Sequence, residues 1–241
     1  MKRCLKNALV FAAAMAGMWC AASVCFAHHL WVQEGDDTYG VCRGIIGDRL
    51  DPYDPSCIKH ISAKAPDGTE LSVNRLNEKD RIVFTTNEKP ALVAVVSEWG
   101  DRVNTTRGKK LMNRQAAETA GLTVVSAFVS TQFSKNLFAP SAGNSQPLGL
   151  KFELVPLTDP MTLAPGTPAA FKVLFDGRPL EGISVFDDLD RESKTDENGI
   201  AEIAFEKGGM HLLYAAHRIP AEQNSGLDYL KFMTFLTFEV N

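Results

Sequence analysis

The sequence predicts a mainly β fold arranged as two sandwich-like units, and three observations support this prediction. Short runs of alternating apolar and polar residues, separated by Gly, Pro, Asn and Asp, recur along most of the chain. Helix-forming composition is confined to one region, residues 109–138. One stretch, residues 139–147, combines Pro, Ser, Gly and Asn as linkers do, and it separates a first unit, 28–147, from a second, 148–241.

The first unit begins with several short strand patterns. Residues 44–56 are rich in Gly, Asp and Pro, so they are predicted to form a loop. Residues 91–96 are apolar on both faces, which is typical of a buried central strand. One or two short helices are expected within residues 109–120 and 123–138, where Lys, Gln, Ala and Met are followed by further apolar positions. The predicted strands cover residues 30–32, 38–41, 60–64, 70–73, 81–85 and 91–96.

The second unit shows a clear period of two. Phe171, Val173 and Phe175 share one face of a predicted strand. The Asn198-Gly199 pair predicts a hairpin turn, because such a turn needs positive φ at its central positions. Several strands joined by such turns predict an antiparallel sandwich of the immunoglobulin- or transthyretin-like kind over about 90 residues.

The amino-terminal residues 1–27 have the composition of an export signal. Three basic residues precede an apolar run, and small residues at Cys25 and Ala27 stand at the positions that a signal peptidase requires. We therefore expect cleavage after Ala27 and a periplasmic location. The alternative is an uncleaved anchor, since the apolar run approaches the length of a membrane span.

The charge balance and the cysteines limit the partners and the chemistry. The formal net charge is −4, and removal of the signal would make the chain more acidic, which argues against nucleic acid and anionic membrane surfaces as partners. Three of the five cysteines lie in the signal, and the remaining two are Cys42 and Cys57. An even pair in an exported protein predicts a disulfide between them. Two thiolate metal ligands are the competing interpretation.

Cleavage after Ala27 would create a cluster of metal ligands at the new terminus. His28 would carry a free α-amine, and His29 would follow it. The amine titrates near ~7.7–8.0 and an imidazole near ~6.5, so both can bind a transition metal at neutral pH. His217, at a predicted strand end, and His60, after Cys57, are candidates to complete the shell. His211 is expected at the surface.

The sequence contains few motifs for any other chemistry, and no enzymatic activity is expected. The sequence contains no Ser nucleophile elbow and no phosphate-binding Gly loop. An acidic run at Asp187, Asp188 and Asp190 lacks the spacing of a calcium loop, so we expect a solvated hairpin edge there.

Several motifs together resemble a known bacterial family. They are Leu154 to Pro160, Val173 to Leu180, Thr195 to Gly199, Thr237 to Val240, the loop Pro52 to Pro55, and the pair His28 and Trp31 at the expected mature terminus. The chain is similar in these motifs, over essentially all of residues 28–241, to periplasmic proteins long catalogued under a domain of unknown function. That family is described as the NikM-type, substrate-specific component of nickel and cobalt uptake. The resemblance implies Ni²⁺ or Co²⁺ as the ion and a membrane metal-transporter subunit as a partner.

Three hypotheses follow for the function. The first is a metal-binding accessory of nickel or cobalt uptake that binds the ion through His28 and its neighbours. A second is an adhesion or binding module in which the sandwich is a scaffold and the histidines are incidental. The third is a copper-binding protein, since affinity alone favours Cu²⁺ over Ni²⁺ at nitrogen ligands.

Overall fold

The computed structural model describes residues 28–240 and consists of three β-sheets with few helices. The prediction of a mainly β, sandwich-like fold is confirmed. The predicted signal, 1–27, lies outside the described residues. Three 3-10 turns accompany one short α-helix in the part of the chain that is described, and no helix there is long and apolar enough to cross a bilayer. These helical elements are α1 (Arg114–Thr119), η1 (Pro55–Cys57), η2 (Ala142–Ser145) and η3 (Pro160–Thr162).

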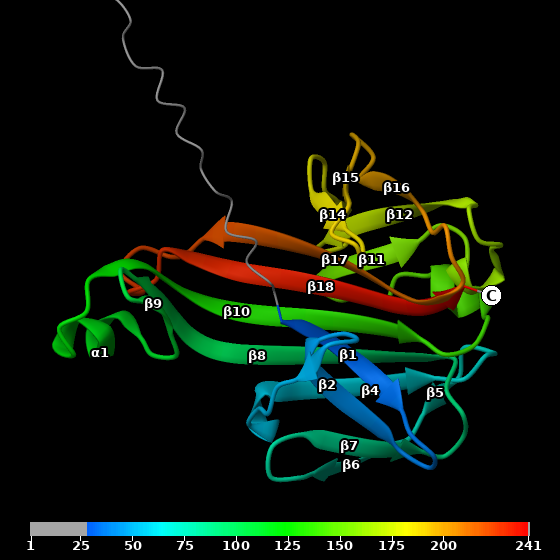
Figure 1. Cartoon of the computed structure of the whole chain (residues 1–241), viewed down its shortest axis with the longest axis horizontal. Coiled ribbons are helices and arrows are strands. Elements are labelled where there is room, and N and C mark those ends of the chain that lie inside the picture. Colours follow the sequence, from blue (N-terminus) through cyan, green and yellow to red (C-terminus); the bar gives the residue numbers. More distant parts are fainter. Residues whose placement is uncertain (1–27, 241) are drawn as a thin grey trace, which may run out of the picture.

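A large central sheet forms the middle layer of the molecule (Figure 1). Its strands run in the order β15 (Glu192–Lys194), β14 (Ser184–Phe186), β17 (Gly209–Pro220), β18 (Tyr229–Val240), β10 (Val124–Leu137), β8 (Leu92–Thr105), β4 (Ile58–Lys64) and β5 (Glu70–Leu71), with β9 (Gly108–Lys110) beside β8. Neighbouring strands are antiparallel except β10 and β18, which are parallel.

Two smaller sheets cover the two faces of the central sheet. The first, which we call the amino-terminal sheet, contains β1 (His29–Glu34), β2 (Tyr39–Ile45), β3 (Arg49–Leu50), β6 (Val73–Asn77) and β7 (Ile82–Thr86). The other, the carboxyl-terminal sheet, contains β11 (Phe152–Pro156), β12 (Pro168–Phe175), β13 (Arg178–Pro179) and β16 (Ile200–Ala204).

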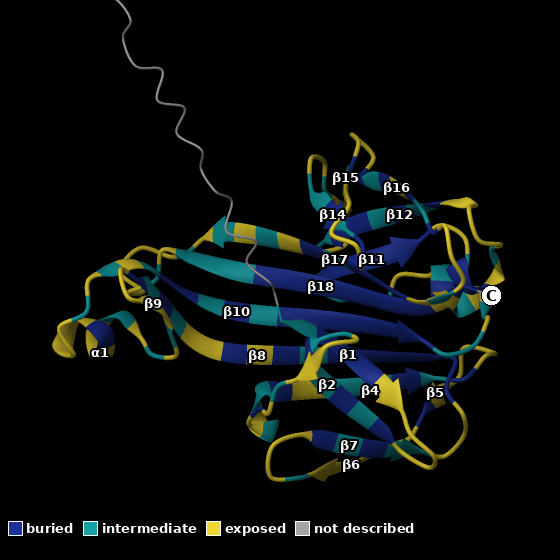
Figure 2. Ribbon diagram, in the orientation of Figure 1, coloured by how far each residue is buried: buried dark blue, intermediate teal, exposed yellow. Residues whose placement is uncertain are grey.

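The alternation of side chains along β8 shows how the central sheet contributes to two separate cores. Val93 and Val95 pack with the apolar residues of the amino-terminal sheet. Leu92 and Ala94, which point the other way, pack with those of the carboxyl-terminal sheet. Both faces of β8 are buried at its start, over residues 92–95, and the run 91–96 is apolar without interruption, as a buried central strand requires (Figure 2).

Strands from both sides of the predicted boundary after residue 147 join in this one sheet. The parallel pairing of β10 with β18 connects the first half of the chain to its end. The stretch of linker composition is closely packed: Asn144 is fully buried, and its Nδ2 donates to Asp159 Oδ2 at 2.9 Å. The two predicted units therefore share a sheet.

The structure corrects part of the helix prediction. A helix does form within 109–120, as α1. Most of the second predicted region, 123–138, forms the strand β10 (Val124–Leu137) instead, because β-branched and aromatic residues such as Val124, Phe128 and Val129 favour an extended chain. The Asn198-Gly199 turn is present, with Gly199 at φ +73°, but it leads from β15 to β16 in a different sheet and so is not a hairpin.

Four long strands extend the central sheet beyond the sandwich as an arm (Figure 1). β8, β10, β17 and β18 each contain 12 or 14 residues. The tip of the arm carries β9, which pairs with β8, and α1, whose Ala117 forms a small apolar core with Val103 and Ala127. This core holds the tip together independently of the two larger cores.

A buried amide on β10 connects the amino-terminal sheet to the central sheet. Asn136 is 1% exposed, and its Oδ1 accepts from the backbone N–H of Val32 on β1 at 2.9 Å. The same oxygen accepts from the Thr237 hydroxyl at 2.8 Å, and Nδ2 donates to the Val93 carbonyl at 3.1 Å. The Asn136 side chain thus binds β1 of the amino-terminal sheet as well as β8 and β18, the two neighbours of β10 in the central sheet.

Replacement of this amide should destabilise the fold strongly. We expect Asn136→Ala to lower the free energy of unfolding by about 3 kcal/mol, because it leaves buried donors and an acceptor without partners. Urea denaturation measures the change. Asn104→Ala is the matched control, since the Asn104 amide lies half-buried on the arm and donates one side-chain bond, to Ser126. Equal effects of the two substitutions would contradict the role given to Asn136.

Candidate functional site

The candidate site is centred on His28, immediately before β1. Its Nε2 lies 2.9 Å from Asp51 Oδ2, and the His28 side chain is 38% exposed. Asp51 follows β3 in the predicted loop, where its Oδ1 accepts from Arg49 Nε at 3.0 Å. Asp51 Oδ2 is buried, and no group among the described residues donates a hydrogen bond to it in good geometry. The His28 ring contacts this oxygen within ion-pair distance. The second nitrogen of the ring, Nδ1, faces away from this carboxylate by the geometry of imidazole.

His29 lies next to this pair but is held differently. Its Nδ1 accepts from the backbone N–H of Ile46 at 3.3 Å, whereas Nε2 has no hydrogen-bond partner among residues 28–240. The ring lies near Tyr214 of β17, with 5.6 Å between the ring centroids. Tyr214 in turn donates to Asp190 at 2.8 Å. The site is therefore built where β1 crosses the central sheet.

Both rings are neutral at pH 7. Burial, followed by the positive charge of Arg43, lowers the pKa of His28 below its ordinary 6.5, although Asp51 opposes this shift. Burial also lowers the pKa of His29. A neutral imidazole has an unprotonated nitrogen, which is the form that binds a metal ion.

The structure does not bring the other predicted ligands to His28. His217 is half-buried and packs against Phe175 and Phe152 of the carboxyl-terminal sheet, with 4.9 and 6.0 Å between ring centroids. His60 is exposed on β4 and pairs in register with Val96, so it lies on the face of the sheet opposite to its core-facing neighbour Ile61. The central sheet therefore separates both of these histidines from the amino-terminal site.

Side chains alone do not assemble a metal site in residues 28–240. No group of three or more His, Cys, Asp or Glu side chains in this range is arranged to hold an ion. A site at His28 would therefore need a ligand that is not a side chain, such as the α-amine. Asp51 was not among the predicted site residues, because its approach to His28 depends on the folding of the loop against β1.

The predicted disulfide is wrong. Cys42 and Cys57 are both free. Cys57 packs against the core beneath the amino-terminal sheet, together with Val41. Cys42 is the next residue after Val41 on β2, so its side chain points to the opposite, outer face. Burial raises the pKa of the Cys42 thiol to about 11, so it is protonated at neutral pH.

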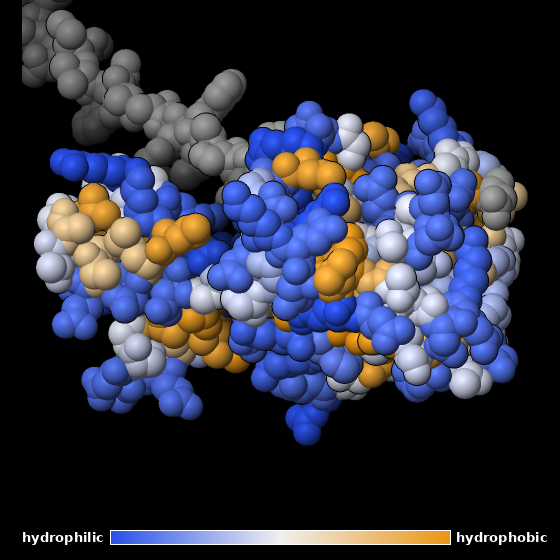
Figure 3. Space-filling model, turned by 90° about the horizontal axis from the view of Figure 1, so that it is seen from below, coloured by the Kyte–Doolittle hydropathy of each residue, from blue (hydrophilic) through white to orange (hydrophobic). Residues whose placement is uncertain are grey.

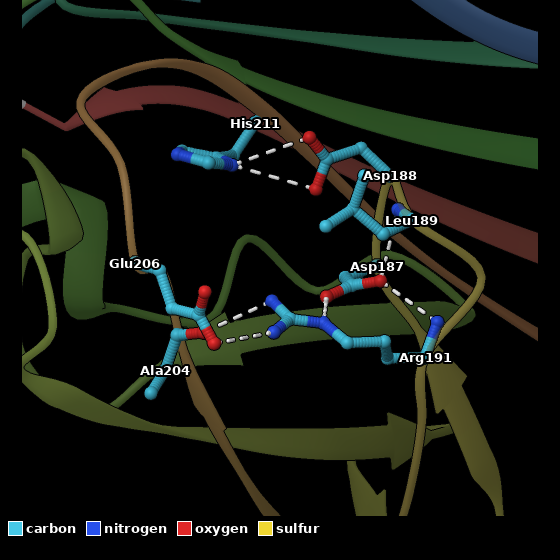
Figure 4. A network of polar contacts seen from close by, with 7 residues as sticks. All are labelled: Asp187, Asp188, Leu189, Arg191, Ala204, Glu206 and His211. Atoms are coloured by element: carbon cyan, nitrogen blue, oxygen red, sulfur yellow. Dashed lines mark hydrogen bonds and ion pairs between the residues drawn. The ribbon is translucent and has the colours of Figure 1, made fainter.

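His211 and Asp187 are buried, whereas Asp188 and Asp190 of the acidic run are exposed. Figure 4 shows the contacts around His211 and Asp187. His211, expected at the surface, is 8% exposed, and its Nε2 donates to the Lys207 carbonyl at 2.8 Å. Asp187, expected on a solvated edge, is fully buried and accepts from Arg191 Nε at 2.7 Å. Asp188 lies 3.4 Å from His211 Nδ1. These contacts fix the loop after β14 and do not form a calcium site.

Comparison with known proteins assigns a family but no activity. Residues 25–219 match the family described as Domain of unknown function (DUF4198). A search among curated proteins gives no match. The match covers most of the chain and includes every residue of the candidate site.

Protonation of the buried histidines should make stability depend on pH. Because the folded pKa of His29 is lowered below 6.5, the unfolded chain binds more protons than the folded protein below that pH. We expect the histidine contribution to the free energy of unfolding to be constant above about pH 7.5 and to fall as the pH drops through 6.5 toward 5.5.

Urea titrations at several pH values measure this dependence. His29→Gln should make the decline between pH 7 and 5.5 shallower, because one of the groups that resists protonation is removed. His60→Gln, at an exposed position, is the control and should leave the slope unchanged. A wild-type slope in His29→Gln would show that His29 is protonated equally in both states.

Proposed function

The chain belongs to the DUF4198 family, and we propose that it is a periplasmic metal-binding protein that binds Ni²⁺ or Co²⁺ through the amino terminus. In this proposal the signal is cleaved after Ala27. The α-amine and Nδ1 of His28 then bind one ion, and His29 supplies a further nitrogen. The observation that carries the proposal is the contact of Asp51 Oδ2 with His28 Nε2 at 2.9 Å.

This contact fits the arrangement of a terminal chelate. The amine of a histidine can close a small ring only with Nδ1 of its own side chain, so Nε2 must remain free for another partner. Metal-binding imidazoles commonly have a carboxylate at the second nitrogen, which orients the ring and strengthens the ligand. Asp51 occupies that place, and Arg49 holds the carboxylate in position.

The chemistry of the ligands favours a transition metal. Amine and imidazole nitrogens bind Ni²⁺, Co²⁺ and Cu²⁺ better than the hard cations Mg²⁺ and Ca²⁺, which prefer oxygen. The chelate also has a low entropic cost, because both donors belong to a residue already fixed beside β1. Solvent, or a membrane metal-transporter subunit, completes the shell in this proposal. A copper-binding protein would use the same chelate, so competition between Cu²⁺ and Ni²⁺ is part of the test.

Extension of the terminus by one residue tests the proposal directly. We compare a protein that begins at His28 with one that carries a single Gly before it, by isothermal titration with NiCl₂, CoCl₂ and CuCl₂. The extension removes the amine from chelating distance, so affinity should fall at least tenfold, about 1.4 kcal/mol. Asp51→Asn should weaken binding by about 10-fold to 100-fold, because the ring loses its orienting carboxylate.

His60→Ala is the control for these titrations, because His60 lies exposed on another part of the central sheet. It should leave all three affinities unchanged. Equal affinity of the two amino termini would exclude the terminal chelate. No binding by either protein would favour a binding or adhesion module instead.

A further inference from the structure

One segment at the tip of the arm, residues 102–117, carries five basic side chains and no acidic one, and Glu118 and Asp228 lie beside it. Between Asp101 and Glu118 the sequence contains no acidic residue, although the protein as a whole has more acidic than basic side chains. The basic residues of this segment are Arg102, Arg107, Lys109, Lys110 and Arg114. They lie on the end of β8, in the turn that follows it (Arg107), on β9 and at the start of α1.

These cations differ in what they contact. Arg114 binds Asp228 at 2.6 Å and therefore belongs to the internal structure of the tip. Arg107, Lys109 and Lys110 make no ion pair with any residue in the range 28–240. Their charge is available to a partner outside the chain.

Large apolar side chains lie exposed beside these cations. Leu111 directly follows Lys110 and is 72% exposed, and Val125 is 67% exposed. Val125 stands at an irregularity in the pairing of β10 with β8, between the paired residues Val124 and Ser126. Hydrophobic side chains gather on the lobe at the end of the arm (Figure 3). Exposed apolar groups at a projecting tip often mark an interaction site.

We propose that the arm-tip patch, defined as Arg107, Lys109, Lys110, Leu111 and Val125, docks on an anionic phospholipid surface. Leu111 and Val125 enter the boundary between headgroups and acyl chains, while the neighbouring cations stay at the level of the phosphates. Lys and Arg side chains are suited to this, because their long apolar stems allow the charge to remain in the polar layer. The inference is independent of metal binding at His28.

The shape and the charge of the patch together favour a lipid surface over an acidic protein. The patch lies at the end of an arm that projects from the sandwich, where it can reach a flat surface without contact by the rest of the molecule (Figure 1). An anionic bilayer attracts the basic tip and repels the acidic remainder of the chain, so it would also orient the protein. The net charge of the whole chain disfavours anionic membranes as partners. It does not govern a contact made by the tip alone.

Vesicle sedimentation tests the proposal. The chain from His28 to Asn241 contains all described strands and lacks the apolar residues 1–27, which could bind lipid themselves. It is mixed with vesicles of phosphatidylcholine alone or with 30% phosphatidylglycerol, at about 50 and 500 mM NaCl. We expect binding to the anionic vesicles at low salt, and at least tenfold weaker binding to neutral vesicles or at high salt.

Paired variants separate the two contributions. Lys109→Gln with Lys110→Gln should weaken binding at least tenfold, because each cation near an anionic surface contributes about fivefold. Leu111→Ser with Val125→Ser should weaken it severalfold. Leu76→Ser is the matched control, since Leu76 is 60% exposed on β6 and should have no effect. Circular dichroism establishes that each variant is folded.

Tryptophan fluorescence measures insertion of the arm tip into the bilayer. The native Trp31 and Trp99 are 4% and 6% exposed, so vesicles should change their fluorescence little. A blue shift of emission in Leu111→Trp on addition of anionic vesicles would therefore report insertion of the tip. Failure of the wild-type chain to bind anionic vesicles at low salt would overturn the proposal and favour an acidic protein as the partner. Binding that neither double variant weakens would also overturn it, by placing the contact elsewhere.

Discussion

The fully bonded amide of Asn136 is the constraint on which the position of the candidate site depends. An amide buried without partners costs several kcal/mol, so its place in the interior requires that Val32, Thr237 and Val93 lie where they do. Apolar packing between two sheets allows sliding, whereas a hydrogen bond with defined direction does not. The bond to Val32 fixes β1 over the central sheet; His29 is the first residue of that strand, and His28 directly precedes it.

The neighbouring residue of β10 has the same role on the opposite face. Lys135 is 1% exposed, and its Nζ donates to the Gln146 carbonyl at 2.9 Å and lies 3.7 Å from Glu153. Burial lowers the pKa of Lys135 to about 8, although Glu153 opposes the shift. Burial also raises the pKa of Glu153. Since successive residues of a strand point to opposite sides, Lys135 and Asn136 attach one outer layer each to the same strand.

These buried polar residues also explain which parts of the fold the sequence could predict. Periodicity located most strands, because a strand with one buried face alternates regularly. It failed for β10, where Lys135 and Asn136 interrupt the apolar pattern on both faces and resemble a helix composition. The parallel pairing of β10 with β18 joins distant segments, which no local pattern reports. At the site, His28 and His29 were predicted from the expected terminus, but the approach of Asp51 follows from loop folding alone.

The surroundings of Asp51 bear on which ion the proposed site would select. Its carboxylate is shared between Arg49 at 3.0 Å, Arg43 at 3.9 Å and the His28 ring, so most of its negative charge is already balanced. A hard cation such as Ca²⁺ depends on negative oxygen ligands and would find few there. A transition metal gains its binding energy from neutral nitrogen donors, and burial together with the nearby guanidinium groups lowers the pKa of His28 and so favours its unprotonated form. The positive charges around His28 would thus disfavour Ca²⁺ and Mg²⁺ while preserving the nitrogens that Ni²⁺ or Co²⁺ needs.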